Sequence, residues 1–190
     1  GPLAGPVVAA AVIFSGRANI NELIRIGIRD SKLLSAKKRV YLYEKIVERC
    51  DDWAVSIISE EVIDEINILQ ATKLAMIRAV ESLKIKPDFL LIDGNFTLDD
   101  FPASQLAIPK GDQNVFSVSA ASVLAKVTRD RILVDLDIQY PDYGFAKHKG
   151  YGTKEHMDAL CRKGPCKIHR KSFSPVDRLI SKFKDAGLAK

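Results

Sequence analysis

The sequence predicts a mixed α/β domain, and three observations lead to that prediction. Short apolar runs rich in β-branched residues alternate with longer segments in which apolar residues recur every three or four positions. Two of the short runs end near an Asp beside a Gly, at Asp93 and Asp112. The 190 residues are 47% hydrophobic, which is enough for one buried core. We therefore expect a single domain over residues 1–190, with a core over about 1–145 and a basic helical region over about 146–190.

The first half of the chain predicts two strands and two helices. Residues 7–14 are almost all apolar and form the first expected strand. Ser35 stands where a helix N-cap is expected, and apolar residues on one face predict a helix over about 36–49. A second strand is expected over 53–58, and helical spacing returns from Glu60 to Leu83 before a proline ends it.

The second half predicts two short strands followed by helices. The strands end at Asp93 and just before Asp112, and their apolar composition predicts that both are buried. A long helix that begins with small residues is expected over about 115–139. Further helices are expected from Thr153 and, after a proline, from Pro175.

Composition excludes several classes of protein. No run approaches the roughly 18 uncharged apolar residues of a membrane span, and no basic segment precedes residues 7–14 to suggest a secretion signal. Three cysteines are an odd number, so we expect reduced thiols in a cytoplasmic protein. The chain lacks the Gly-x-Ser-x-Gly motif, which disfavours a serine hydrolase of the α/β-hydrolase type. It also lacks the glycine-rich phosphate loop that ends in Gly-Lys-Ser/Thr, which disfavours a nucleoside triphosphatase with that loop.

The charge is unevenly distributed. The net charge is +5, and between Lys147 and Lys190 twelve Lys and Arg residues stand against four Asp and Glu residues. A phosphate-rich partner fits this asymmetry, and a solvated basic surface explains it equally well.

The two aspartates are candidate metal ligands. A carboxylate at the end of a buried strand is costly without a partner, and a divalent cation supplies one. If both strands end at the same edge of a sheet, Asp93 and Asp112 can share a site. The alternative is that each Asp caps a turn beside its glycine.

Three polar segments are candidate contacts for a phosphodiester or a sugar. The loop Lys149–Thr153 places a tyrosine between two glycines, where the ring can stack on a sugar or base. Asp30–Lys32 and His169–Phe173 offer hydroxyl, ammonium and guanidinium donors. Each segment can equally be an ordinary turn with surface cations.

Taken together, these segments resemble bacterial ribonuclease HII, the type 2 ribonuclease H. The matching stretches are residues 1–12, 30–32, 67–72, 92–94, 110–112, 119–130, 143–151 and 169–173. The resemblance implies a ribonuclease H-like five-stranded mixed sheet flanked by helices, with a helical C-terminal appendage. It also implies hydrolysis of the RNA strand of RNA/DNA hybrids and cutting at ribonucleotides embedded in duplex DNA, which leaves 5′-phosphate and 3′-hydroxyl ends. Roles in DNA repair and replication follow from that activity.

The resemblance also implies roles for individual residues. In that family four carboxylates hold two Mg²⁺ or Mn²⁺ ions, and two of the four match Asp93 and Asp112. By the same resemblance Asp112 helps to hold the ion that activates the attacking water, and Asp93 the ion that stabilises the leaving 3′ oxygen. Tyr151 would stack at the ribose-to-deoxyribose junction. The implied phosphate contacts are Ser31, Lys32, His148, Lys149 and Arg170.

The chain departs from the family pattern at its start. The family motif Asp-Glu-x-Gly-Arg-Gly supplies two carboxylates and the backbone that senses the ribonucleotide, and here only its last glycine is present, as Gly1. Most of the first strand, which lies between the strand 7–14 and the strand ending at Asp93, is expected to be missing with it. We therefore expect an N-terminally truncated chain that is impaired in catalysis.

Two alternatives remain open at this point. The chain can be a fragment or paralogue that binds hybrids without cutting them, or a different two-metal nuclease of the same fold, such as a resolvase or integrase relative. We expect a monomer that acts on RNA/DNA hybrid and on duplex DNA containing ribonucleotides, and not on a membrane.

Overall fold

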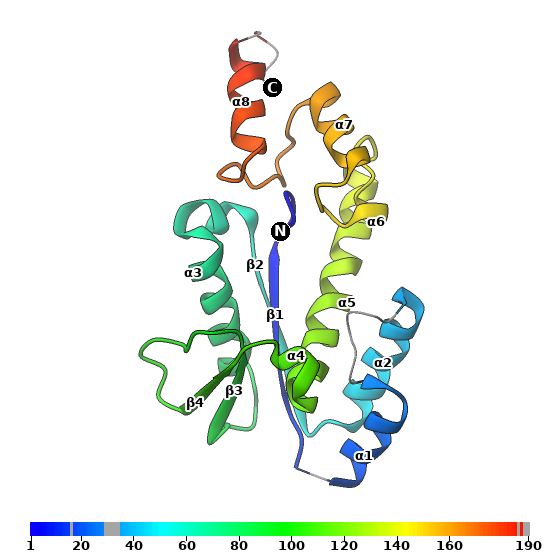
Figure 1. The fold of residues 1–190 in the computed structure, drawn as a ribbon, viewed down its shortest axis with the longest axis vertical. Coiled ribbons are helices and arrows are strands. Elements are labelled where there is room, and N and C mark those ends of the chain that lie inside the picture. Colours follow the sequence, from blue (N-terminus) through cyan, green and yellow to red (C-terminus); the bar gives the residue numbers. More distant parts are fainter. Residues whose placement is uncertain (16, 29–34, 186, 188–190) are drawn as a thin grey trace. The chain divides into compact units, whose positions relative to one another are not determined.

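The computed structural model has the predicted mixed α/β composition (Figure 1). It describes residues 1–15, 17–28, 35–185 and 187. Contacts group the chain into two compact units, which we describe separately. Unit 1 comprises Gly1–Val7, Ile58–Ala71 and Arg129–Lys190, and unit 2 comprises Val8–Ile57 and Thr72–Thr128. The single-domain organisation remains a prediction.

Unit 2 begins with the strand and helices expected from the sequence. Strand β1 (Val7–Ile13) pairs with β2 (Asp52–Ile58), and helix α2 (Ala36–Arg49) lies between them in sequence. The Ser35 hydroxyl accepts a hydrogen bond from the Lys38 amide at 3.3 Å, which confirms the predicted N-cap. Helix α1 (Arg17–Arg25) was not predicted, because its nine residues give too short a periodic pattern.

Helix α3 (Glu60–Glu81) is interrupted where the sequence predicts an unbroken helix. Asn67 has φ 64° and ψ 166°, outside the helical region. Its side-chain Oδ1 accepts hydrogen bonds from the amides of Leu69 and Gln70 at 3.0 and 3.1 Å. The side chain thus caps the second part of the helix in the manner of an N-cap. Apolar periodicity continues across residue 67, so the pattern alone does not reveal the break.

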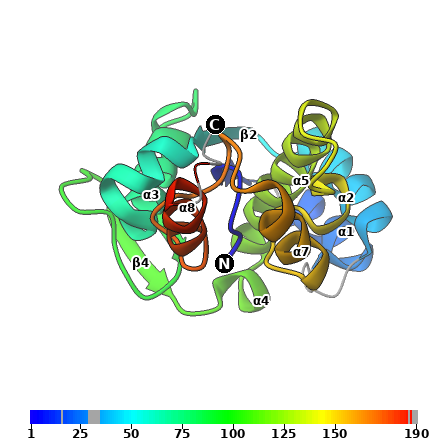
Figure 2. The same ribbon diagram turned by 90° about the horizontal axis from the view of Figure 1, so that it is seen from above.

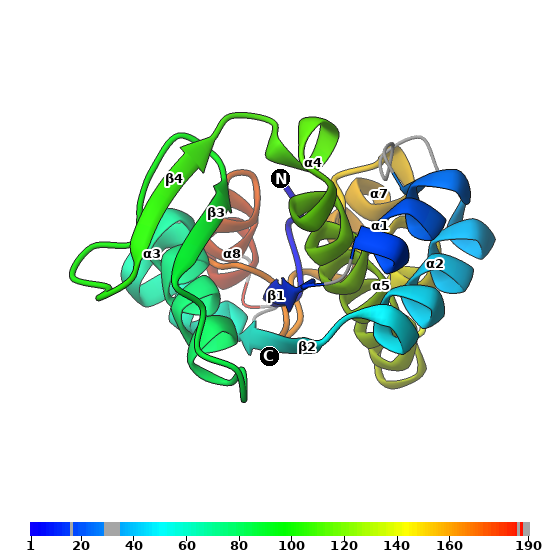
Figure 3. The same ribbon diagram turned by 90° about the horizontal axis from the view of Figure 1, so that it is seen from below.

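Strands β3 (Phe89–Asp93) and β4 (Ser104–Ile108) pair in parallel (Figure 3). Leu90 and Ile92 are buried against apolar residues of the second half of α3. The opposite face is exposed, with Phe89, Leu91 and Leu106 at 53%, 41% and 51%. The prediction that both strands are buried is therefore wrong for this face, because successive side chains of a strand point to opposite sides.

Among the described residues the strands form two separate pairs, β1 with β2 and β3 with β4. The implied five-stranded sheet is thus represented by four strands.

The long helix α5 (Phe116–Gln139) follows the short helix α4 (Gly111–Asn114) and confirms the predicted helix over 115–139. Its first half, with Ala120, Val123 and Leu124, packs in unit 2 against apolar residues of α1 and α2. Its small residues at the start allow this close packing.

Unit 1 holds the C-terminal helices α6 (Phe145–His148), α7 (Lys154–Lys163) and α8 (Val176–Asp185). Leu133 of α5 and Leu160 of α7 share a buried core with Phe145, and Figure 2 shows α7 against the second half of α5. Thr153 caps α7 by accepting from the His156 amide, and α8 starts directly after Pro175, as predicted. In the described part of the chain, no helix is both long and apolar enough to cross a membrane.

Candidate active site

The two predicted aspartates lie close together at one edge of the β3 and β4 pair. Asp93 ends β3 and lies opposite Ile108, the last residue of β4. The chain then turns into α4, which lies between the end of β4 and the start of α5 (Figure 3). The Asp112 amide, in the first turn of α4, faces the Asp93 carboxylate with an N to Oδ1 distance of 3.4 Å. Parallel pairing therefore brings both aspartates to the same place, as the sequence predicts.

Small and strained residues make this approach possible. Lys110 adopts a left-handed conformation with φ 56°, which turns the chain sharply after β4. A Cβ on Gly111 would lie 3.1 Å from Val118 Cγ1 and 3.5 Å from Asp93 Oδ1, so a larger residue would crowd both neighbours. The Ser119 hydroxyl donates to the Asp112 carbonyl at 2.5 Å and anchors the turn to α5.

The pair has the chemistry of a partial site for a hard divalent cation. Asp112 is only 2% exposed, and Asp93 is half-buried. Carboxylate oxygens are preferred ligands of Mg²⁺, which usually takes one or two protein carboxylates and completes its shell with waters and substrate phosphates. Over the described ranges no group of three or more His, Cys, Asp and Glu side chains is arranged to hold a metal ion. Two aspartates at one strand edge fit such an ion as part of a site that substrate oxygens help to complete.

The loop Lys149–Thr153, which we call the tyrosine loop, lies in unit 1. Lys149 and Gly150 both have positive φ, 52° and 79°, and the turn presents Tyr151 with 45% of its surface exposed. The Gly150 carbonyl accepts a hydrogen bond from the Leu3 amide at 2.7 Å. This bond fastens the loop to residues 1–7, which we call the N-terminal segment. The Lys149 ammonium donates to the Ala146 carbonyl. An exposed ring on a rigid turn suits stacking on a sugar or base.

Replacing Gly150 with Ala is expected to lower the free energy of unfolding by about 1–3 kcal/mol, because a left-handed conformation is strained for alanine. In addition, the new Cβ would lie 2.6 Å from the Ala4 carbonyl oxygen, so the loop must shift. Urea unfolding of the two proteins measures this effect. Gly152→Ala is the matched control, since its Cβ would meet only the flexible end of Leu3 at 3.2 Å. Equal losses in both variants would contradict the role given to the close approach at Gly150.

The structure corrects the predictions for His148 and Arg170. Both side chains are buried, at 7% and 2% exposed. His148 Nε2 lies 2.7 Å from the Tyr143 carbonyl, and its Nδ1 accepts from the Gly150 amide at 3.2 Å. Arg170 donates from Nε to the Gly5 carbonyl at 3.0 Å and from Nη2 to the Pro6 carbonyl at 3.2 Å. Because these donors are used inside the protein, we assign neither side chain to phosphate contact.

The remaining predicted contacts are not all described. Ser31 and Lys32 lie outside the described residues. Gly1 is exposed, and a Cβ built on it meets no atom within 4 Å. Lys149 and Tyr151 remain the predicted contacts that present at least part of their side chains to solvent.

Sequence reasoning missed a buried cluster of histidines in unit 1. His156 Nε2 lies 3.0 Å from His169 Nε2, His156 Nδ1 lies 2.9 Å from the Tyr151 carbonyl, and the Cys166 amide donates to His169 Nδ1 at 2.9 Å. Burial lowers the pKa of His156 and lowers that of His169 to about 3, whereas it raises the pKa of Cys166 to about 11. Thirteen residues separate the two histidines, so no local spacing indicates that they are partners.

Arg129 is the second residue that sequence reasoning missed. Its guanidinium donates to three backbone carbonyls, those of Ala4, Pro6 and Lys149. Burial lowers its pKa, and burial together with the nearby Arg129 charge lowers the pKa of Arg170 to about 10. The only sequence signal was that Arg129 falls within one of the stretches that carry the family resemblance.

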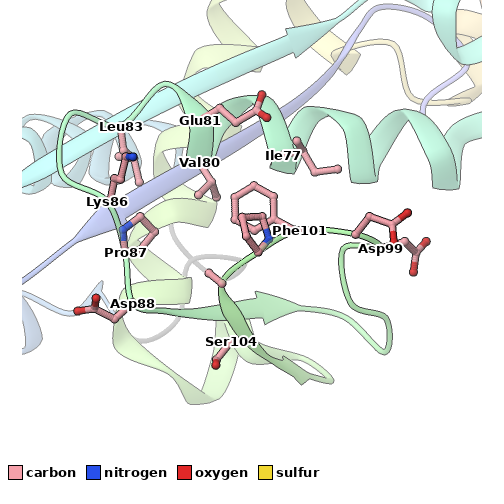
Figure 4. A pocket seen from close by; sticks show the side chains of 13 residues that line it. Ile77, Val80, Glu81, Leu83, Lys86, Pro87, Asp88, Asp99, Phe101 and Ser104 are labelled. Carbon is pink, nitrogen blue, oxygen red and sulfur yellow. The ribbon is translucent and has the colours of Figure 1, made fainter.

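A separate cavity in unit 2 has a volume of about 700 Å³ (Figure 4). It is lined by the end of α3 and by the segments that precede β3 and β4. Ile77, Val80 and Phe101 line its apolar part, and Asp88 and Asp99 lie at its edge. Neither of the paired aspartates lines it, so this cavity is distinct from the candidate metal site.

Comparisons with known proteins show which family the chain resembles over most of its length. A family model described as Ribonuclease HII matches residues 1–176. The Ribonuclease HII of Coxiella burnetii (strain Dugway 5J108-111) is 55% identical over 179 residues, which are 94% of this chain and 86% of that protein. A crystal structure of the ribonuclease H2 from Pyrococcus horikoshii OT3 superposes with a TM-score of 0.81 at 28% identity and covers 97% of this chain and 94% of that one.

A more distant structure shares the fold. The crystal structure of Bst-RNase HIII in complex with Mn²⁺ is 17% identical, with a TM-score of 0.67 over 97% of this chain and 67% of that one. The predicted ribonuclease H-like fold class is confirmed by these neighbours together with the mixed α/β architecture. The match of the family model over most of the chain, with a relative that is more than half identical, shows that the chain belongs to the ribonuclease HII family of endoribonucleases.

Proposed function

We propose that the protein cuts the RNA strand of RNA/DNA hybrids and cuts at single ribonucleotides embedded in duplex DNA, by a mechanism that uses two divalent ions. The observation that carries this proposal is the placement of Asp93 and Asp112 against each other at one strand edge of a ribonuclease HII family chain. The family name supports cleavage of RNA, and hybrid duplexes are the substrates on which ribonucleases H act.

Asp93 and Asp112 are proposed to hold Mg²⁺ or Mn²⁺. The Mn²⁺ complex of the distant Bst-RNase HIII supports a divalent ion in this fold. When bound, such ions stabilise the negative charge that develops at the scissile phosphate and lower the pKa of a water. The protein's own role is to hold its carboxylates in place before the substrate binds. The hydrogen bond from the Ser119 hydroxyl to the Asp112 carbonyl contributes to this by anchoring the Asp112 backbone. No side chain is needed as a nucleophile.

Tyr151 is proposed to stack at the junction between ribose and deoxyribose, with the backbone at Gly1 beside the same nucleotide. Lys149, Ser31 and Lys32 are proposed as phosphate contacts, and the basic C-terminal segment is proposed to supply further long-range attraction to the duplex. Each phosphate contact should affect affinity and its salt dependence more than selectivity. We also propose that the protein acts as a cytoplasmic monomer.

The test is cleavage of a DNA duplex that carries one ribonucleotide, with the same all-DNA duplex as control, in Mg²⁺ or Mn²⁺. Both the printed chain and a version with Asp-Glu-x-Gly-Arg placed before Gly1 are assayed. We expect the extended version to cut only the ribonucleotide-containing duplex and to leave 5′-phosphate and 3′-hydroxyl ends. Ends with a 2′,3′-cyclic phosphate would contradict the metal mechanism. Tight binding without cutting by either version would support the binding-only alternative, and robust cutting by the printed chain would contradict the need for the motif's carboxylates.

A further inference from the structure

Arg129 joins two segments that are far apart in the sequence. Its Nε donates to the Pro6 carbonyl at 3.1 Å, and its Nη2 donates to the Ala4 carbonyl at 3.0 Å. Its Nη1 donates to the Lys149 carbonyl at 3.0 Å. All four residues belong to unit 1. A guanidinium offers five N–H donors in a rigid plane, so one side chain can hold these three carbonyls at set positions.

The same guanidinium lies over the ring of Tyr151. The distance from its central carbon to the ring centroid is 5.7 Å, which is within the range of a cation–π contact. The ring nevertheless keeps 45% of its surface exposed. Arg129 therefore contacts the side chain of Tyr151 and the backbone two residues before it, and leaves part of the ring accessible to a ligand.

Arg129 is half-buried, and partial removal of its charge from water costs free energy. In the described segments Arg129 forms no ion pair with a carboxylate, and desolvation lowers its pKa. Three neutral carbonyls and an aromatic ring compensate for part of that cost. An apolar side chain would fill the space without this cost, but it would not tie the N-terminal segment to the tyrosine loop.

We propose that Arg129 is a specificity-determining positioning residue, which holds the Tyr151 ring and the turn that carries it in the orientation that recognises one ribose. The inference rests on the proposed function of Tyr151. Arg129 itself touches no substrate atom in this proposal. It acts through the orientation of the ring and of the turn that carries it.

Arg170 provides a matched control in the same unit. Arg170 is buried whereas Arg129 is half-buried, and it too donates to carbonyls of the N-terminal segment, those of Gly5 and Pro6. Its guanidinium lies over Phe173, at 5.1 Å, rather than over Tyr151. Replacing either arginine by lysine thus loosens the N-terminal segment, whereas only Arg129→Lys also loosens the tyrosine loop.

The experiment measures binding rather than cleavage, in EDTA, so that it applies to the chain as printed. Fluorescence anisotropy gives Kd for a duplex with one ribonucleotide and for the same all-DNA duplex, and the ratio of the two is the selectivity. We expect Arg129→Lys to reduce the selectivity about fivefold, the size of one lost cation–π contact with its associated hydrogen bonds. Arg170→Lys should leave the selectivity unchanged, even where both variants lose the same unfolding free energy.

Further variants distinguish a failure of the inference about Arg129 from a failure of the function proposed for Tyr151. Tyr151→Leu should abolish the selectivity, and Arg129→Lys should have no further effect in that background. Unchanged selectivity in Arg129→Lys alone overturns the inference. Unchanged selectivity in Tyr151→Leu overturns instead the function proposed for the tyrosine.

A measurement on the unaltered chain covers the case in which Arg129→Lys does not fold. The Arg129 Nε–H proton should show an upfield ring-current shift in the NMR spectrum, and this shift should vanish in Tyr151→Leu, which removes the ring itself. A spectrum that is the same with and without the ring overturns the contact on which the inference is built.

Discussion

Asp112→Asn and Asp93→Asn are each expected to abolish cleavage in the version of the protein that carries Asp-Glu-x-Gly-Arg before Gly1. Asparagine keeps the shape of aspartate but removes the negative charge that attracts a divalent ion. Losing an outer-shell partner of a metal ligand costs about 10–100-fold, so losing a direct ligand should cost at least about 100-fold in rate. The fold should survive, because the hydrogen bond from Ser119 reaches the Asp112 backbone rather than its side chain.

Single-turnover cleavage across a range of Mg²⁺ and Mn²⁺ concentrations measures this effect, and calorimetry with Mn²⁺ gives the loss of affinity independently of activity. Asp88→Asn is the control, since Asp88 is an exposed carboxylate just before the opposite end of β3. We expect it to cut at the unaltered rate. If both paired aspartates can be replaced while cleavage continues normally, the assignment of this strand edge as the active site is wrong.

The stability of the protein is expected to fall steeply below about pH 6.5 because of the buried histidines. The hydrogen bonds require neutral rings. His156 Nδ1 donates to the Tyr151 carbonyl, so its Nε2 must accept from His169, whose Nδ1 in turn accepts from the Cys166 amide. A proton added to His169 Nδ1 would place an N–H against the Cys166 amide N–H, which now donates to this nitrogen. These rings also pack against Phe145, in a buried cluster that keeps out the water needed to solvate an imidazolium.

The direction of this pH dependence follows from the pKa of His169, which is lowered from its usual 6.5 to about 3 in the folded protein. The unfolded chain binds this proton first, so the stability is complete above about pH 6.5 and is lost as the pH falls toward 3. One such group changes the unfolding free energy by about 1.4 kcal/mol per pH unit in that window. His156, whose pKa is also lowered, adds to the slope.

Urea unfolding at a series of pH values between 7.5 and 4 measures the slope, and His169→Gln serves as the comparison. Glutamine can donate to His156 but does not titrate, so this variant should be less stable at pH 7.5 and lose less stability on acidification. An identical slope in the two proteins would show that His169 does not remain neutral in the fold.

Local sequence patterns were sufficient to predict most of the helices and strands. The Ser35 and Thr153 caps, the long helix over 116–139 and the four strands all follow from short-range chemistry, in which hydroxyls cap helices and apolar spacing sets the period. The break at Asn67 was not predicted, because a side chain that caps the second part of a helix leaves the apolar spacing unchanged. The exposed face of β3 was misjudged because an apolar run does not reveal whether one or both faces are covered.

For the site, the sequence was sufficient to select Asp93, Asp112 and Tyr151 as candidates. It could not tell which of the basic residues face solvent. His148 and Arg170 belong to the basic segment by composition. The His148 nitrogens are nevertheless used on the nearby backbone of Tyr143 and Gly150, and those of Arg170 on the distant carbonyls of Gly5 and Pro6. Arg129 was not selected, although it contacts both the N-terminal segment and the tyrosine loop.

By itself the sequence determined the fold class, the family and the two carboxylates, because each is encoded in residue types at short and regular spacing. Only the tertiary structure decided which cations are buried supports, how the histidines pair and what holds the tyrosine ring. Those outcomes depend on hydrogen bonds between residues as many as 165 positions apart, and a contact of that range leaves no periodic signal in the chain.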